Sequence, residues 1–167
     1  TPVTVKSISG KPQDCIIDFN GKRGFNISNA SAVLSGFRLH SGIATTTNMI
    51  LMAGGEVNNC LVADETLLKH VSISATDGAV ISNCAFTNNI ISSSRSIVSL
   101  NRSSICDSKF IGNGVHTTIM SMYSSTMENC EMHFNNNNSW ASPFLINATG
   151  KSLISKSQFN SNDGKNN

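Results

Sequence analysis

A small group of side chains in this sequence could bind a sugar. Asp18, Arg38 and His40 fall at corresponding positions of two neighbouring segments, and Trp140 stands beside a run of asparagines. A carboxylate, a guanidinium and an imidazole can hydrogen-bond sugar hydroxyls, and an exposed indole can stack on a sugar ring. We take these four as the candidate carbohydrate-binding residues. The alternatives are solvated charges or a surface ion pair worth at most about 1 kcal/mol, and a tryptophan packed on its own loop.

Cleavage of a polysaccharide would need more acidic residues than the sequence brings together. Such sites combine several carboxylates around Ca²⁺ or a sugar with an Arg or Lys base. Lys109 and Glu131 are expected to form an outward pair, whereas Asp64 and Glu65 are adjacent and should point apart. No pair of carboxylates at glycosidase spacing is visible. We therefore assign no catalytic residue and do not expect an enzyme.

The cysteines and histidines do not suggest a metal site. The five cysteines include no C-x2-C pair, and the four histidines share no ligand spacing, so we expect neither a metal nor another cofactor. Four cysteines occupy one repeat position, where they are interpreted as small buried residues. A disulfide between Cys60 and Cys84 is the alternative. The cysteines that share the position are Cys15, Cys60, Cys84 and Cys130.

Composition excludes several classes of protein. With 167 residues and a net charge of +2, the chain has no concentrated basic patch, so we expect no nucleic-acid partner. Its apolar runs are far shorter than the roughly 18 residues of a membrane span. The first residues already alternate like a strand and lack the character of a signal peptide. We expect residues 1–167 to form one domain, as a segment of a longer secreted or cell-surface protein.

The elements that must position these side chains are short repeats. Two apolar residues flank a small one in segments such as Ile81–Phe86 and Ile105–Phe110. The central position of this pattern recurs at residues 15, 37, 60, 84, 108, 130 and 157, in steps of 22 to 27 residues. A nearly constant period of this size indicates a solenoid.

Each repeat has a defined register. The central residue and the residue two places later should point inward, while the residue between them points outward, as in a strand. The residue before the centre is usually Asn, Asp or Gly, types that tolerate a left-handed backbone, so we expect a bend there and a ladder of stacked polar side chains. The predicted core stack contains Cys60, Cys84, Cys130, Phe86, Phe110 and Phe159, and the predicted ladder contains Asn59, Asn83, Asp107 and Asn129.

A further apolar segment precedes each of these bends. Three short strands and three turns in every repeat describe an all-β fold, a right-handed parallel β-helix of about six to seven coils of 22–27 residues. Amphipathic helices, which a TIM barrel or doubly wound sheet would need, are not found. The leucines are too sparse for leucine-rich repeats.

Three repeats end in F-x-x-N, at Phe86–Asn89, Phe110–Asn113 and Phe159–Asn162, and Met132–Asn135 is a near copy. This motif resembles the repeat of the chlamydial polymorphic outer-membrane proteins, whose autotransporter passenger domains are β-helices. The companion motif G-G-A-[ILV] is missing, with Gly54 and Gly55 as a partial match. The resemblance implies surface display and adhesion and names no ligand.

Two functions therefore stand as hypotheses. The first is a non-catalytic secreted or cell-surface segment that serves adhesion or acts as a structural stalk or filament unit. Its partners would be a host or cell-surface glycan or protein, or further copies stacked end to end. The alternative is a module that binds or cleaves polysaccharide with one outward strand face. Because such a fold hosts adhesins, lyases and rods alike, the fold does not choose between them.

Overall fold

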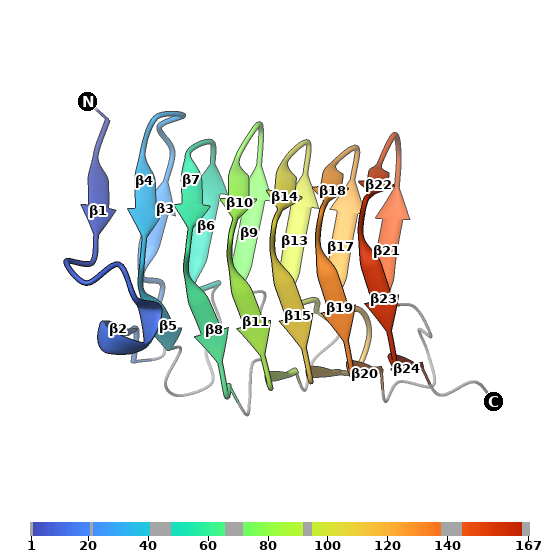
Figure 1. Ribbon diagram of the computed structural model, residues 1–167. Helices are drawn as coiled ribbons and strands as arrows, with labels where there is room; N and C mark the ends of the chain where they lie inside the picture. Colours follow the sequence, from blue (N-terminus) through green and yellow to red (C-terminus); the bar gives the residue numbers. More distant parts are fainter. Residues whose placement is uncertain are drawn as a thin grey trace.

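The computed structural model describes residues 2–20, 22–40, 48–65, 72–91, 95–137 and 145–164. These residues form a β-solenoid in which every strand pair between coils is parallel, which confirms the predicted fold class. The chain descends along the near side of the solenoid, returns along the far side and advances by one strand per turn, which gives a right-handed coil (Figure 1).

Four stacked sheets form the walls. The first contains β1 (Thr4–Lys6), β4 (Val33–Ser35), β7 (Glu56–Asn58), β10 (Val80–Ser82), β14 (Ser104–Cys106), β18 (Thr126–Glu128) and β22 (Leu153–Ser155). The second contains β2 (Ile16–Asp18), β5 (Arg38–His40), β8 (Leu61–Ala63), β11 (Ala85–Thr87), β15 (Lys109–Ile111), β19 (Glu131–His133) and β23 (Gln158–Asn160).

The other two sheets complete each turn. The third contains β3 (Phe25–Ile27), β6 (Ile50–Ala53), β9 (Ile73–Thr76), β13 (Val98–Asn101), β17 (Met120–Tyr123) and β21 (Ile146–Thr149). The fourth contains β12 (Ile90–Ile91), β16 (Gly114–Val115), β20 (Asn136–Asn137) and β24 (Asp163–Gly164). The stack makes about five turns, slightly fewer than the six to seven coils predicted, and its sheets hold seven, seven, six and four strands.

In the third sheet, a buried apolar residue directly precedes several strands, as Ile97 precedes β13 and Ile119 precedes β17. The carbonyl of Ile119, for example, accepts hydrogen bonds from both Ile97 N–H and Val98 N–H, at 2.9 and 3.3 Å. Such a shared carbonyl marks a bulge, so two successive buried residues precede or open the strand and extend its apolar run. The short fourth sheet was not predicted.

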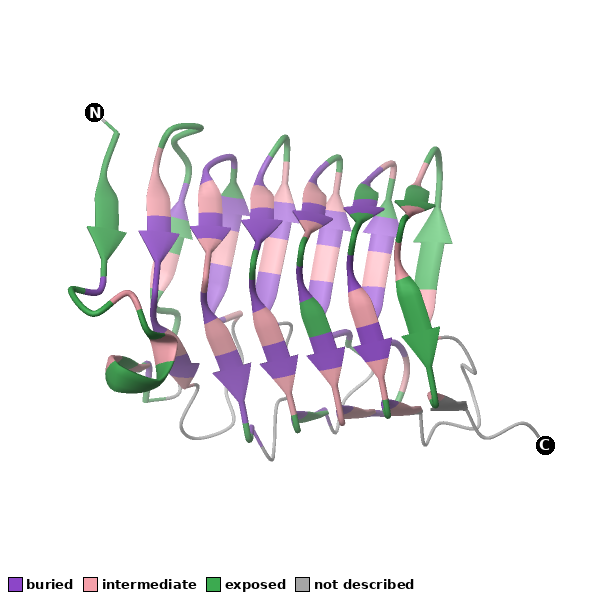
Figure 2. Ribbon diagram, in the orientation of Figure 1, coloured by how far each residue is buried: buried purple, intermediate pink, exposed green. Residues whose placement is uncertain are grey.

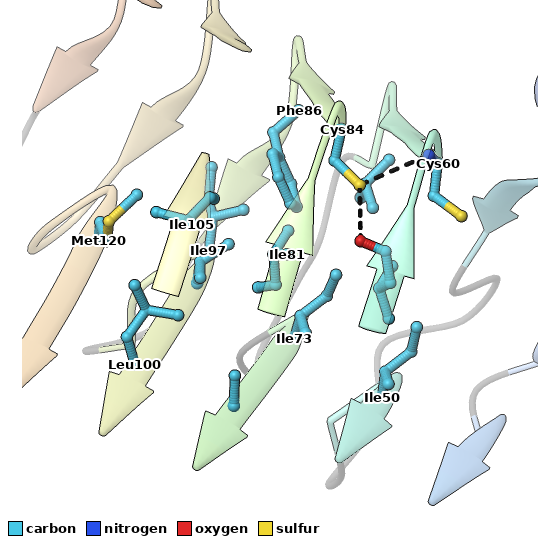
Figure 3. Packing of buried hydrophobic residues seen from close by; sticks show 14 of the residues in the cluster. Ile50, Cys60, Ile73, Ile81, Cys84, Phe86, Ile97, Leu100, Ile105 and Met120 are labelled. Carbon is cyan, nitrogen blue, oxygen red and sulfur yellow. Dashed lines mark hydrogen bonds between the residues drawn. The ribbon is translucent and has the colours of Figure 1, made fainter. Parts of the chain in front are cut away.

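Inward positions form continuous apolar columns. In the second sheet, Val62, Phe86, Phe110 and Met132 lie in one register and are at most 1% exposed. Figure 2 shows this burial in the middle coils and the exposure of the outer strands, and Figure 3 shows how Ile81, Phe86 and Ile105 pack. The cysteines of the predicted core stack, Cys60, Cys84 and Cys130, are also buried.

Phe159 differs from the rest of the predicted core stack. It continues the column above Met132, yet 45% of its surface is exposed. The reason is its place on β23, the outermost strand of the second sheet among the described residues. Ile154 on β22 is exposed for the same reason, as is Val5 on β1 at the opposite end.

The bend between the first two sheets adopts the expected left-handed backbone. The φ angles are 48° at Asn59, 51° at Asn83, Asp107 and Asn129, and 50° at Lys156, although lysine is a poor residue for this geometry. The predicted polar ladder is incomplete, however. Asn129 Nδ2 donates to Asp107 Oδ1 at 2.6 Å, and Asn59 Nδ2 donates to the Gly10 carbonyl at 2.7 Å, but these two bonds do not belong to one continuous chain.

The continuous ladder is buried and is built from the last residue of the F-x-x-N motif. In this asparagine ladder, each Oδ1 accepts the backbone N–H and the Nδ2 of the preceding asparagine, as in Asn89 to Asn113 at 3.0 Å for both. Each Nδ2 also donates to a carbonyl of the preceding coil, as in Asn113 to Phe86 O at 2.8 Å. The members of the asparagine ladder are Asn89, Asn113, Asn135 and Asn162.

Residues at the central repeat position also bond between coils. Ser108 Oγ accepts the N–H of Cys84 at 3.1 Å, and Ser157 Oγ accepts that of Cys130 at 3.2 Å. Cys84 Sγ likewise accepts the N–H of Cys60 at 3.5 Å (Figure 3). A small residue with a hydrogen-bonding atom is therefore favoured here, because it satisfies a backbone group at the bend.

Candidate functional site

The strongest polar cluster lies on the outward side of the second sheet, where three coils meet. Arg38 Nη2 is 3.1 Å from Asp64 Oδ2 and also donates to the Ala63 carbonyl at 3.4 Å. Asn88 Nδ2 donates to the other carboxylate oxygen of Asp64 at 3.3 Å. With His40 and Glu65, these residues form the Arg38 cluster. Consecutive coils supply its members, so the solenoid stacking itself positions the cluster.

A buried carboxylate orients the imidazole in this cluster. Glu65 Oε1 lies 2.7 Å from His40 Nδ1, and the two side chains are 3% and 41% exposed. Glu65 occupies the repeat position that holds the asparagine ladder in later coils, and its backbone N–H donates to Asn89 Oδ1 at 3.2 Å. The ladder thus begins next to the Arg38 cluster. This contact holds the imidazole through Nδ1 and leaves Nε2 as its other ring nitrogen.

The structure brings together two of the four residues that were predicted to bind carbohydrate. Arg38 and His40 lie on the same face of β5 and belong to one cluster. Asp18 is in register with His40, but its Oδ1 accepts the N–H of Asn20 at 2.7 Å in its own turn. Among the described residues, Arg38 therefore forms its ion pair with Asp64 of the following coil and not with Asp18. Trp140 lies outside the described residues.

A second outward group follows further along the same sheet. Lys109 Nζ is 3.1 Å from Glu131 Oε2, as expected for side chains paired across β15 and β19. His133 Nε2 approaches the same oxygen at 3.5 Å. The hydrogen bond from Lys109 lowers the pKa of Glu131, with His133 adding a smaller favourable charge. These exposed groups resemble a solvated ion network more than a reaction centre.

The described residues offer little for metal or nucleophilic chemistry. No group of three or more His, Cys, Asp or Glu side chains among them could hold a metal ion. All five cysteines are free thiols, which answers the open question about Cys60 and Cys84 in this structure. Burial raises the pKa of Cys84, and it raises that of Cys130 to about 11. Neither is a reactive thiolate at neutral pH.

The Arg38 cluster can therefore bind polar groups, and its one oriented base is His40. Carboxylate-held imidazoles serve in proteins as bases or as metal ligands when other groups converge on the free nitrogen. Within the described part of the chain no nucleophile is bonded to His40 and no second carboxylate pairs with it. The cluster offers hydrogen-bond donors and acceptors to a polar ligand.

Sequence reasoning found Arg38, His40, Lys109 and Glu131 but missed the role of Asp64 and Glu65. The missed signal was the repeat period: Arg38 and Asp64 are 26 residues apart, about one coil. None of the described helices is long and apolar enough to span a membrane. Comparison of the chain with protein-family models, curated proteins and solved structures gives no match.

Proposed function

We propose that this chain is a non-catalytic segment of a secreted or cell-surface protein, in which the solenoid acts as a stalk and presents an adhesive face. The observation that carries the proposal is the continuity of the stack. Two sheets run through seven strands in register, and the buried asparagine ladder continues the bonding inside them. In such a structure most of the sequence serves to build a long, rigid stack. Its outward ion pairs are dispersed over different coils.

The F-x-x-N motif supports this role in a specific way. The aromatic residue fills the inward column, and the asparagine bonds the neighbouring coil, so the motif serves stacking in each repeat. Its resemblance to the chlamydial surface proteins is consistent with an autotransporter-like adhesin, and we include surface display in the proposal on that ground. The motif itself has a structural explanation that any secreted β-solenoid could share.

End-to-end assembly belongs to the same proposal. Val5 and Ile154 occupy the same inward column of the first sheet, at opposite ends, and are 38% exposed each. Further coils or another copy would cover such surfaces and pair the open strand edges. Light scattering over a concentration series tests self-association: growth of the mass with concentration supports a filament unit, and a constant monomer mass contradicts it.

A polysaccharide-active module is the second candidate, and the Arg38 cluster favours it. Product formation from polygalacturonate, followed at 235 nm with and without Ca²⁺, separates the two functions. The stalk proposal expects no product in either condition. Turnover by the wild-type chain that His40→Ala abolishes would replace it with an enzymatic function, and Lys109→Ala serves as a control on the same sheet.

A further inference from the structure

The outward face of the third sheet differs from the others because its strands carry no charge. From β6 to β21 its outward positions hold Ser, Thr, Asn, Leu, Ala and Tyr only. The second sheet, by comparison, places Arg38, Lys109 and Glu131 outward. The lack of charge is thus a property of the strands of this sheet, and the Arg102–Asp77 ion pair adjoins the ends of β13 and β9.

A shallow hollow of about 260 Å³ lies on this face, across β13, β17 and β21. Two outward columns line it. Ser99, Ser121 and Asn147 are in register in one column, and Asn101, Tyr123 and Thr149 are in register in the other. Three successive coils therefore offer hydroxyl or amide groups side by side, about 4.8 Å apart along the solenoid.

Tyr123 supplies an aromatic surface at the hollow. It is the only tyrosine of the chain, and 53% of its surface is exposed. The next coil places Gly150 beside it, where a β-carbon would come within 3.3 Å of Tyr123 Cε2 and within 2.6 Å of Ser124 Oγ. The absence of a side chain at Gly150, whose φ is 66°, leaves room for the ring.

Only part of the polar lining is bonded within the protein. Thr149 Oγ1 donates to the Met122 carbonyl at 3.3 Å, and Ser121 Oγ lies 3.5 Å from Thr118 Oγ1. Asn101 Oδ1, in contrast, is buried without a hydrogen-bond partner among the described residues. The asparagine ladder shows the opposite case, in which amide groups are fully bonded. A buried polar group without a hydrogen-bond partner lowers stability, and a ligand that supplies the partner removes this cost.

We propose that this face, the Tyr123 face, binds a neutral oligosaccharide whose chain crosses successive coils. Sugar rings present C–H faces that stack on an aromatic ring, and their hydroxyls both donate to and accept from amides and hydroxyls. An uncharged surface offers no attraction to an acidic polymer. The proposal rests on the adhesive part of the proposed function and names the class of ligand and the face that holds it.

Titration calorimetry with maltohexaose, cellohexaose and chitohexaose tests this proposal, with polygalacturonate as the acidic comparison. The protein is produced in a bacterial host, so that Asn101 and Asn147, which begin N-x-[ST] tripeptides, carry no glycan. We expect one or more of the neutral hexasaccharides to bind. Tyr123→Ala should weaken that binding by about tenfold, the size of a lost aromatic stacking contact.

The matched control is Phe134→Asn, which removes another exposed ring. Phe134 is 66% exposed and lies after β19 with a φ of 55°, a conformation that asparagine tolerates. Its replacement should leave the affinity unchanged. Tyr123→Phe retains the ring and should retain most of the binding. Circular dichroism of each variant shows whether the fold is intact.

Three results would overturn the proposal: no binding of the three neutral sugars at millimolar concentration, unchanged affinity in Tyr123→Ala, or binding of polygalacturonate alone. Failure of the glycan site leaves the stalk function standing, since stacking does not depend on Tyr123. Conversely, turnover of polygalacturonate would overturn the non-catalytic function while leaving the result for Tyr123 and neutral sugars unaffected.

Discussion

Phe86 and Phe110 are stacked on adjacent coils, with ring centroids 4.7 Å apart and ring planes 7° from parallel. This spacing equals the distance between neighbouring strands in a sheet, so the backbone register sets the ring separation. Both side chains are fully buried. The stack therefore joins two coils through their cores as well as through their backbone hydrogen bonds.

Removal of one of these rings should lower the free energy of unfolding considerably. We expect Phe86→Ala to lower the free energy of unfolding by about 3 to 5 kcal/mol, because it leaves a cavity between coils. Thr87→Ala changes an outward residue of the same strand and should lower it by less than about 1 kcal/mol. Urea unfolding of both variants measures the difference. Equal losses would contradict the inward and outward assignment on β11.

The asparagine ladder should stabilise the fold by an amount comparable to the phenylalanine stack, although its side chains are polar. Asn113→Ala removes the acceptor of Asn89 N–H and Nδ2 and the donor to Phe86 O, and all of these groups are buried. We expect a loss of about 3 kcal/mol or more in the free energy of unfolding, since the partners cannot reach water. Asn88→Gly, at an exposed position with a φ of 53°, is the control and should be much milder. A small loss in Asn113→Ala would show that the ladder is dispensable.

The sequence predicted the inward columns well because they follow a fixed offset from a recognisable pattern. It did not predict which asparagines are buried, since Asn83 at the bend and Asn89 in the ladder belong to one Asn-rich segment. Burial depends on the turn between β11 and β12: Asn88 has a positive φ and is exposed, whereas Asn89, the next residue, is buried.

The candidate site was harder to predict than the fold. Arg38 was expected near Asp18, its neighbour in the preceding coil, but it pairs with Asp64 in the following coil. Both choices satisfy the repeat period, and only the direction of the side chain distinguishes them. The Tyr123 face was not predicted, because a lack of charged residues produces no recognisable sequence motif. The face is apparent only when the structure places the outward columns side by side.

The bend should tolerate glycine better than a branched side chain. Asn83 has a φ of 51° and is exposed, so its own side chain contributes little burial. A β-branched residue resists this left-handed conformation, and Asn83→Val should lower stability by about 1 to 3 kcal/mol more than Asn83→Gly. Thermal unfolding of the two variants provides the comparison. Similar melting temperatures would argue against a requirement for the bend geometry.

The thiols should divide into two groups by accessibility. Cys60, Cys84 and Cys130 are at most 2% exposed, and burial raises the pKa of Cys84 and Cys130. Iodoacetamide at pH 8 should therefore leave these three unmodified in the folded protein, while half-buried Cys15 reacts first. Mass spectrometry of peptides locates the label. In denaturant all five should react, and a count below five would reveal a disulfide.

The ion pair on the second sheet makes the acid titration of Glu131 depend on Lys109. The hydrogen bond from Lys109 lowers the pKa of Glu131 below its ordinary value of 4.5, so the pair favours the folded state above that value. This contribution should disappear as the pH falls through the lowered pKa. In Lys109→Ala the pKa of Glu131 should rise toward its ordinary value, and ¹³C NMR titration of the Glu131 carboxyl measures it.

A charge removed elsewhere controls for a general electrostatic effect. Arg102 bonds Asp77 on another side of the solenoid and lowers the pKa of that carboxyl by the same kind of contact. Arg102→Ala should therefore raise the pKa of Asp77 and leave that of Glu131 unchanged. Because salt screens exposed pairs, both shifts should shrink at high ionic strength. A Glu131 titration that is identical in wild type and Lys109→Ala would show that this pair does not persist in solution.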